Sequence, residues 1–148
     1  MLGGEVHFLL CHYHADALPR LPTDRFQSTQ VGSDVLVPVC APDAAGRPIS
    51  RFPGTPQGPA RLLAYSQASE LGRILAANPT VMDKTAGMET VFTSHLAATL
   101  SAMAREGHGI AWLPLTLAEQ DLACARLVRA GPAALEVPVE IRLFKAPD

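Results

Sequence analysis

Hydroxyl and amide side chains stand where three short apolar segments end, at residues 61–66, 89–93 and 110–114. If these segments are parallel strands followed by helices, their carboxyl ends meet at one edge of a sheet, close to helix N-termini. Polar side chains beside unpaired helix N–H groups suit an anion or a carboxylate. Ordinary capping explains any one of these residues, whereas three such ends together favour a pocket. The stretches at these ends are Ser66-Gln67-Ala68-Ser69, Thr93-Ser94-His95 and the run from Trp112 to Thr116.

The run CHYH at residues 11–14 is a second concentration of reactive side chains. On an extended strand, His12 and His14 face one side and Cys11 the other. Neighbouring histidines can lower the pKa of a thiol, so Cys11 is a candidate redox sensor, and a plain buried strand cysteine is the simpler alternative. A metal site needs a third or fourth ligand. No metal site is predicted.

Met82 and Met88 flank the polar stretch DKTAG, where exposure is expected. Oxidation of an exposed methionine gives a polar sulfoxide, which makes both residues candidate redox positions beside Cys11. An ordinary structural role is the alternative for each of them.

No motif for catalysis is present. The chain has neither G-x-S-x-G, H-E-x-x-H nor a glycine-rich phosphate loop. Ser94 and His95 are adjacent, and adjacent residues on a helix point apart. We therefore expect neither an enzyme nor a cofactor.

Strands and helices must alternate for these ends to converge. The apolar runs predict buried strands at 6–13, 34–42, 61–66, 89–93, 110–114, 126–128 and 139–144. The expected helices are 67–77, 94–106 and 117–125, and residues 43–60 are a Pro- and Gly-rich linker. This order predicts an α/β fold with a mainly parallel sheet.

Local signals predict the helix ends. Asn78-Pro79 ends the first helix, and Gly107 and Gly109 supply the positive φ of a C-cap and a tight turn. The expected N-caps are Ser66 or Ser69, then Thr93 or Ser94, then a Thr116-x-x-Glu119 capping box.

Composition narrows the function classes. Of the 148 residues 48% are hydrophobic and 18% charged, with a net charge of −2 and no Lys/Arg block, which disfavours a nucleic-acid surface. Three widely spaced cysteines suit a reducing cytosol. Neither a membrane-spanning run nor a signal peptide is expected.

Three quoted segments carry a resemblance to one family. LAATLSAMAREGHGIAWLPLTLAEQDLACARLVRAG, GSDVLVPVCAPD and EVHFLLCHYH, in the order 96–131, 32–43 and 5–14, resemble the effector-binding domain of LysR-type transcriptional regulators. The core motif is G-x-G-I-A-x-L-P. Where the family has a glycine before L-V, this chain has Ala125-Arg126. FLLCHYH and WLP are also similar to the branch linked to hypochlorite or oxidant response.

The resemblance implies a two-lobed, periplasmic-binding-protein-like (type 2) fold with mainly parallel or mixed sheets and an incomplete first lobe. Residues 1–42 would form part of the first subdomain and the crossing strand, and residues 43–148 the second subdomain and the return strand. A small effector, expected to be an anion or carboxylate, would bind between the lobes. The second lobe would contribute Ser66, Gln67, Thr93, Ser94 and the backbone from Trp112 to Pro114, and Cys11 and His12 would approach from the first lobe.

The resemblance also implies partners. Family members self-associate into dimers and tetramers, and they bind DNA through a helix-turn-helix domain that this chain lacks. We expect a cytoplasmic location and no membrane contact. The alternatives are a free-standing periplasmic-type solute-binding protein and a thiol or methionine redox sensor.

Overall fold

The largest sheet of the described structure is long and antiparallel. The computed structural model describes residues 8–13, 27–50, 54–55 and 58–145. In the sheet the strand order is β1-β9-β2-β7, and β8 also pairs with β2. The strands are β1 (Phe8–Tyr13), β2 (Gln27–Cys40), β7 (Ala111–Pro114), β8 (Val128–Arg129) and β9 (Val137–Lys145).

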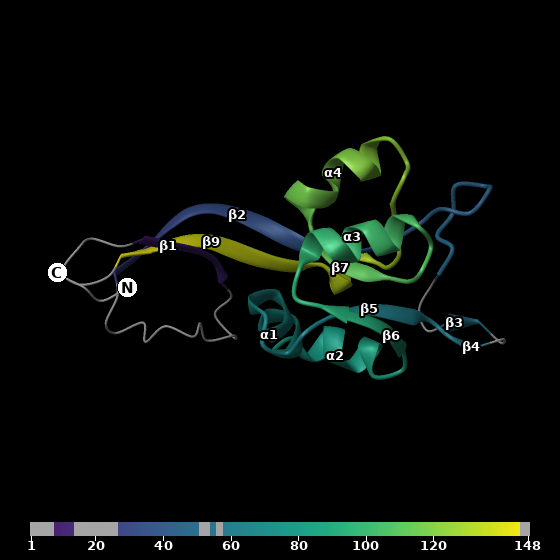
Figure 1. Ribbon diagram of the computed structural model, residues 1–148, viewed down its shortest axis with the longest axis horizontal. Coiled ribbons are helices and arrows are strands. Elements are labelled where there is room, and N and C mark those ends of the chain that lie inside the picture. Colours follow the sequence, from purple (N-terminus) through teal and green to yellow (C-terminus); the bar gives the residue numbers. More distant parts are fainter. Residues whose placement is uncertain (1–7, 14–26, 51–53, 56–57, 146–148) are drawn as a thin grey trace.

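Three of these strands extend away from the helices. Figure 1 shows β2 and β9 running side by side out of the packed part of the molecule, with β1 along the outer part of β9. We call β1, β2 and β9 the three-strand ribbon. Residues 61–129, which contain the α-helices, are called the helical body.

The helical body adds a parallel pair, β5 (Arg61–Tyr65) with β6 (Glu89–Ser94). A parallel bridge from Leu62 to Ile110 joins β5 to the start of β7. Among the described strands, parallel pairing is limited to these places. The α/β fold and mixed sheets are therefore as predicted, but a mainly parallel sheet is wrong, because β9 returns antiparallel beside β2.

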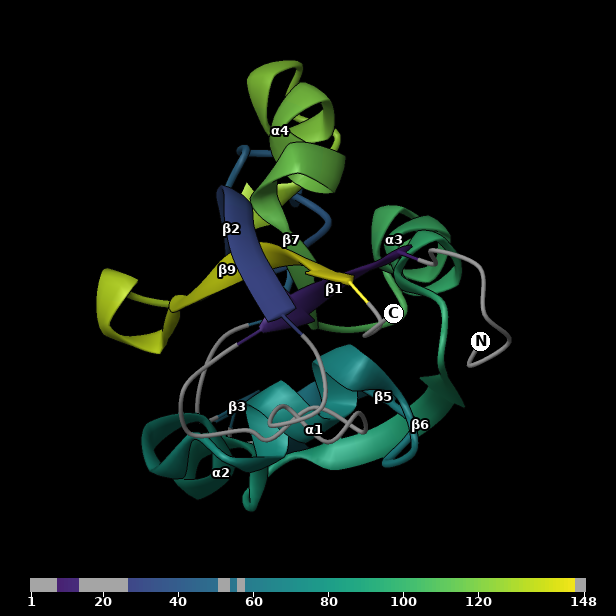
Figure 2. The ribbon, with the colours of Figure 1, turned by 90° about the vertical axis from the view of Figure 1, so that its left-hand side faces the viewer.

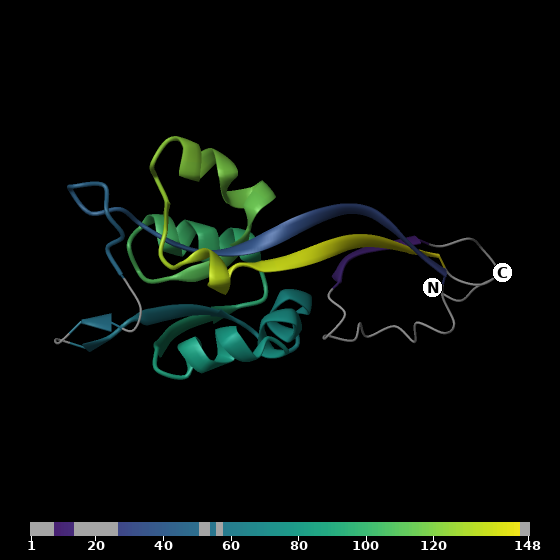
Figure 3. The ribbon, with the colours of Figure 1, turned by 180° about the vertical axis from the view of Figure 1, so that it is seen from behind.

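Helices cover both faces of the β5–β6 pair. Figures 1 and 3 show α3 on one side of the pair and α1 with α2 on the other, and Figure 2 shows α4 beyond β7. The helices are α1 (Glu70–Ala76), α2 (Pro79–Thr85), α3 (Ala97–Arg105), α4 (Leu115–Ala123) and the 3-10 turn η2 (Ala133–Leu135). None of the helices in the described ranges is long and apolar enough to cross a membrane.

The helix α2 was not predicted. Asn78-Pro79 does end α1, but the same pair also starts α2, because the Asn78 side chain accepts a hydrogen bond from the Val81 N–H at 3.0 Å. Proline suits the first helical position, where its missing N–H costs nothing. The stretch DKTAG is therefore mostly helix and not loop. For α1, Ser69 is the N-cap, as predicted, and accepts from the Gly72 N–H at 2.9 Å.

The other two predicted caps are wrong. The N-cap of α3 is Leu96, which makes no side-chain cap, although the Ser94 hydroxyl accepts from the Leu96 N–H at 3.1 Å. The N-cap of α4 is Pro114, so Thr116 lies inside the helix. Asp34 on β2 replaces the expected capping box, because its carboxylate accepts from the Thr116 N–H at 3.3 Å and the Thr116 hydroxyl at 2.6 Å.

Gly107 and Gly109 are required for different reasons. Gly107 has φ +86°, as predicted for the turn after α3. Gly109 does not have positive φ, which corrects the prediction for it. A Cβ at Gly109 would lie 2.9 Å from the Arg61 carbonyl oxygen, which itself accepts from the Ile110 N–H at 2.9 Å. Gly109 is thus explained by the close approach of β7 to β5.

The core lies where β2 and β7 meet the helices. Its largest fully buried side chains include Trp112, Leu36, Leu63, Leu100, Ile110, Leu113, Leu127 and Leu135. The predicted linker, residues 43–60, contains the short hairpin β3 (Gly54–Thr55) and β4 (Gly58–Pro59) and a bridge from Pro42 to Pro48. The predicted domain boundary at residue 42 stays a prediction.

Candidate functional site

The ends of β5 and β6 form one edge. The two strands are parallel and in register there, with Tyr65 opposite Ser94. The Ser66 N–H donates to the Ser94 carbonyl at 3.0 Å, which holds the two strand ends together. The structure thus brings Ser66, Gln67, Thr93 and Ser94 to a common place, which we call the strand-end edge.

Three of these four side chains are unengaged within the described part of the chain. Ser66, Gln67 and Thr93 make no side-chain hydrogen bond to any described residue, whereas the Ser94 hydroxyl accepts from Leu96. Gln67 and Thr93 are exposed, and Ser66 and Ser94 are half-buried. A hydroxyl or amide in this condition can bind a ligand without first breaking an internal bond.

β1 reaches the same region through His12. Its backbone N–H donates to the Glu70 carboxylate, and its Nδ1 lies 2.8 Å from the same oxygen. Glu70 is the first residue of α1, and both side chains are about one-third exposed, at 30% and 34%. This contact joins the three-strand ribbon to the helical body. Cys11 pairs with Arg142 in the strand register, and its side chain and His14 lie outside the described residues.

Trp112 and Pro114 are both buried. Trp112 is 1% exposed, and its indole N–H donates to the Leu135 carbonyl at 2.9 Å. The Tyr65 hydroxyl donates to the Trp112 carbonyl at 2.7 Å, and burial raises the pKa of Tyr65 well above its ordinary value. Pro114 is buried at the carboxyl end of β7, opposite Leu36.

Among the three helices that follow β5, β6 and β7, two have a carboxylate of the chain itself at their start. Glu70 lies in the first turn of α1, and Asp34 accepts from the first turn of α4. The first turn of α3 has no acidic residue. Because like charges repel, an anion would be least opposed at the start of α3, beside Ser94.

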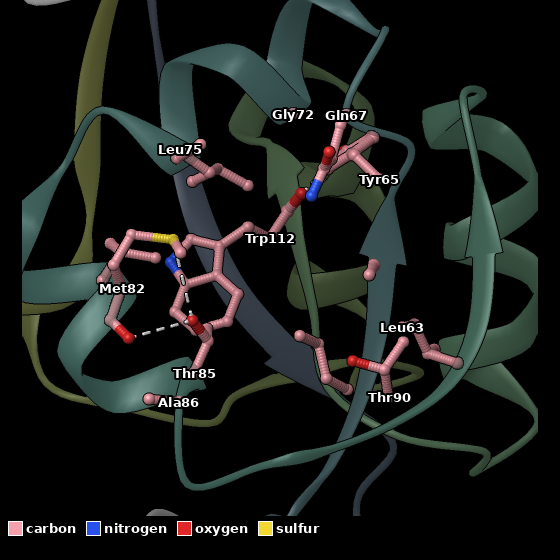
Figure 4. Close-up of a pocket in the computed structure, with 14 residues that line it drawn as sticks. Leu63, Tyr65, Gln67, Gly72, Leu75, Met82, Thr85, Ala86, Thr90 and Trp112 are labelled. Carbon is pink, nitrogen blue, oxygen red and sulfur yellow. Dashed lines mark hydrogen bonds between the residues drawn. The ribbon is translucent and has the colours of Figure 1, made fainter.

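A separate pocket of about 330 Å³ lies beneath α1 and α2. Figure 4 shows Trp112 in its centre, with Tyr65 and Gln67 on one side and Met82 and Thr85 on the other. Of the predicted site residues, it contains Gln67, Trp112 and Met82. Sequence reasoning missed the pocket because it missed α2, and the Asn78-Pro79 pair is the signal that could have revealed it. The lining residues are Leu62, Leu63, Ala64, Tyr65, Gln67, Gly72, Leu75, Ala76, Val81, Met82, Thr85, Ala86, Thr90 and Trp112.

The two candidate redox methionines differ in environment. Met82 is 46% exposed, and the Thr85 hydroxyl lies 3.9 Å from its sulfur. Met88 is half-buried against the core. No group of three or more His, Cys, Asp or Glu side chains in the described ranges is arranged to hold a metal ion.

The family model for the LysR substrate binding domain matches residues 2–145. The HTH-type transcriptional regulator YjiE of Escherichia coli (strain K12) is 29% identical over 133 residues, covering 90% of this chain and 42% of that protein. The HTH domain-truncated transcriptional regulator QseD of Escherichia coli O157:H7 is also 29% identical over 133 residues, covering 90% and 52%. The chain thus spans about half the length of these curated relatives.

Solved structures of LysR-type regulators are also similar to this chain. The apo regulatory domain of HypT from Salmonella typhimurium aligns with TM-score 0.77 and 25% identity, covering 95% of this chain and 64% of that one. Its bromide ion-bound form aligns with TM-score 0.75 and 25% identity, covering 95% and 63%. Full-length HypT, described as a hypochlorite-specific LysR-type transcriptional regulator, aligns with TM-score 0.76 and 26% identity, covering 94% and 45%.

Proposed function

This chain belongs to the LysR substrate-binding domain family, and from that membership we infer that it senses a small molecule for a LysR-type transcriptional regulator. Its curated relatives are transcriptional regulators. For this reason the proposed role is sensing and not catalysis, and a free-standing solute-binding protein is not favoured.

One observation carries the proposed binding site. At the strand-end edge lie the side chains of Ser66, Gln67 and Thr93, none of which makes a hydrogen bond to a described residue. His12 approaches the same end of the helical body from the three-strand ribbon. A ligand at the strand-end edge would therefore touch the region where the two parts of the molecule meet. Cys11, Trp112 and Pro114 would act by shaping this region.

The proposed ligand is a small anion or carboxylate. The start of α3 supplies backbone N–H groups, and Ser94 and Thr93 supply hydroxyl donors. The related HypT regulatory domain is known in a bromide ion-bound form, which is consistent with this chemistry. Glu70 and Asp34 would restrict the ligand to the α3 side of the edge.

Ligand binding would act by favouring a closed arrangement of two lobes. A ligand shifts such an equilibrium only by its difference in affinity for the two states. The His12–Glu70 contact would change as the lobes move, and packing within dimers or tetramers would follow. DNA binding would require the helix-turn-helix domain of the whole regulator, acting in the cytoplasm.

The test is the thermal midpoint of the chain with a panel of small carboxylates and halides. Saturation to about 100 times the dissociation constant should stabilise the fold by about 2.7 kcal/mol, or roughly 5–10 °C for a chain of this size. The double variant Ser66→Ala, Thr93→Ala should lose most of that shift. Thr80→Ala, an exposed position on α2, is the matched control and should keep it.

Equal shifts in the double variant and in Thr80→Ala would contradict the strand-end edge as the site. A panel that shifts nothing, while uncharged analogues do, would contradict the anion assignment.

A second candidate is oxidant sensing at Met82, favoured by its 46% exposure at the pocket wall and by the hypochlorite specificity named for HypT. Hypochlorite would transfer one oxygen atom to the sulfur and leave as chloride. Under limiting hypochlorite, mass spectrometry should find sulfoxide first at Met82, with Met88 slower because it is half-buried. Modification of Cys11 before Met82, tested with Cys11→Ser, would contradict this order.

A further inference from the structure

The pocket beneath α1 and α2 is larger than ordinary packing leaves. Protein interiors contain few voids larger than a single water molecule. At about 330 Å³, this pocket falls within the range of small-molecule sites, which begins near 300 Å³. It lies on the face of β5 that α1 and α2 cover, and only Gln67 is shared with the strand-end edge.

Local hydrogen bonds and close packing hold the backbone around the pocket. Ser69 caps α1 and Asn78 caps α2, each through a side-chain oxygen. Gly72 sits so close to the preceding turn that a Cβ there would lie 2.2 Å from the Ser66 carbonyl oxygen. The small side chains of Ala76 and Ala86 then leave the volume open on the helix side.

The lining selects against charge. None of its side chains is acidic or basic, so a charged ligand would lose its hydration with no opposite charge to compensate. The Tyr65 hydroxyl is engaged by the Trp112 carbonyl. Leu75, Met82 and Ala86 provide the accessible apolar surface, and the buried Trp112 lies behind them.

Hydrogen-bonding capacity in the pocket is small but present. The Thr90 hydroxyl and the Gln67 amide have no partner among the described residues. The Thr85 hydroxyl donates to the Met82 carbonyl at 3.3 Å. A ligand with one or two neutral polar atoms on an apolar ring would match this lining.

We propose that this pocket binds a small uncharged ring compound, packed against Leu75 and Met82 close to Trp112 and hydrogen-bonded by Thr90 or Gln67. This ligand would be uncharged, whereas the ligand proposed for the strand-end edge is an anion or carboxylate. An occupant would also restrain α1, whose first residue, Glu70, contacts His12 of the three-strand ribbon.

The experiment uses a natural reporter, since Trp112 is the one tryptophan of the chain. Its single indole N–H resonance in a ¹H–¹⁵N spectrum is followed during titration with benzyl alcohol, and separately with benzoate. We expect a saturable shift with benzyl alcohol and at least tenfold weaker binding of benzoate. Equal or tighter binding of benzoate at this resonance would overturn the proposal, as would a shift that does not saturate.

Variants locate the binding. Ala86→Leu adds bulk at an exposed position of the lining and should weaken benzyl alcohol at least tenfold. Ala102→Leu, exposed on α3 and outside the pocket, is the matched control and should change nothing. Thr90→Val removes one hydroxyl at nearly constant volume and should weaken binding about threefold. Unchanged affinity in both Ala86→Leu and Thr90→Val would refute the pocket as the binding site.

Discussion

Ala125→Gly should stabilise the protein, although it only removes a methyl group. Ala125 follows α4 with φ +62°, in the left-handed region that glycine favours. The Arg126 N–H donates to the Asp121 carbonyl at 2.9 Å, and the Ala125 N–H donates to the Leu122 carbonyl at 3.4 Å. These two bonds form a Schellman motif with alanine at its left-handed position. The family resemblance described in the sequence analysis also implies a glycine at this position.

The magnitude follows from two opposing terms. A left-handed conformation costs an L-residue roughly 1–2 kcal/mol, which glycine avoids. Glycine also gains freedom in the unfolded chain, which offsets about 0.4–1 kcal/mol. The net expected gain is about 0.5–1 kcal/mol. Because Ala125 is exposed, the lost methyl group removes little buried surface.

Urea unfolding followed by circular dichroism measures this gain, with the slope m unchanged between variants. Ala123→Gly, two residues earlier in the last turn of α4, is the control. It should lose up to about 0.5–1 kcal/mol, because its backbone is helical and glycine there is only an entropic cost. A neutral or destabilising Ala125→Gly would show that the left-handed conformation carries no strain, and the reasoning would fail.

Three further predictions concern the folded state, each measured by urea unfolding. Asp34→Ala should cost about 1 kcal/mol, because Thr116 at the start of α4 loses its cap; no loss would mean that water replaces the carboxylate. Gly109→Ala should cost about 1–3 kcal/mol, since the new methyl group meets the Arg61 carbonyl oxygen, and a neutral result would contradict the close approach. Tyr65→Phe should cost about 0.5–1.5 kcal/mol by removing the buried hydrogen bond from the Tyr65 hydroxyl to the Trp112 carbonyl. Because burial raises the pKa of Tyr65 in the folded state, folding stability should fall as pH rises above about 10, the unfolded value, and this dependence should be smaller in Tyr65→Phe.

Signals within one segment predicted structure well. The apolar runs located β5, β6, β7 and β9, and Ser69 was among the expected caps of α1. The convergence of Ser66 and Ser94 followed from a general property of parallel strands. Each of these inferences needed only neighbours in sequence or one rule of topology.

Contacts between residues far apart in the sequence could not be predicted. Asp34 lies 82 residues from Thr116, so no local pattern could identify it as the partner of α4. Asn78-Pro79 is ambiguous, because the same chemistry ends one helix and starts another. Because α2 was not predicted, neither the pocket that it lines nor the position of Met82 beside Trp112 could be predicted.

The paired strands β2 and β9 have a mechanical consequence. Their ladder runs from Gln27 to Leu36 on one strand, so a displacement of either strand drags the other with it. The register breaks between Gln30 and Gly32, leaving Val31 as an extra residue that is 54% exposed. Such a bulge bends a strand and increases its twist locally. We therefore expect β2 and β9 to resist sliding past each other. We expect the ribbon to twist at the bulge around Val31.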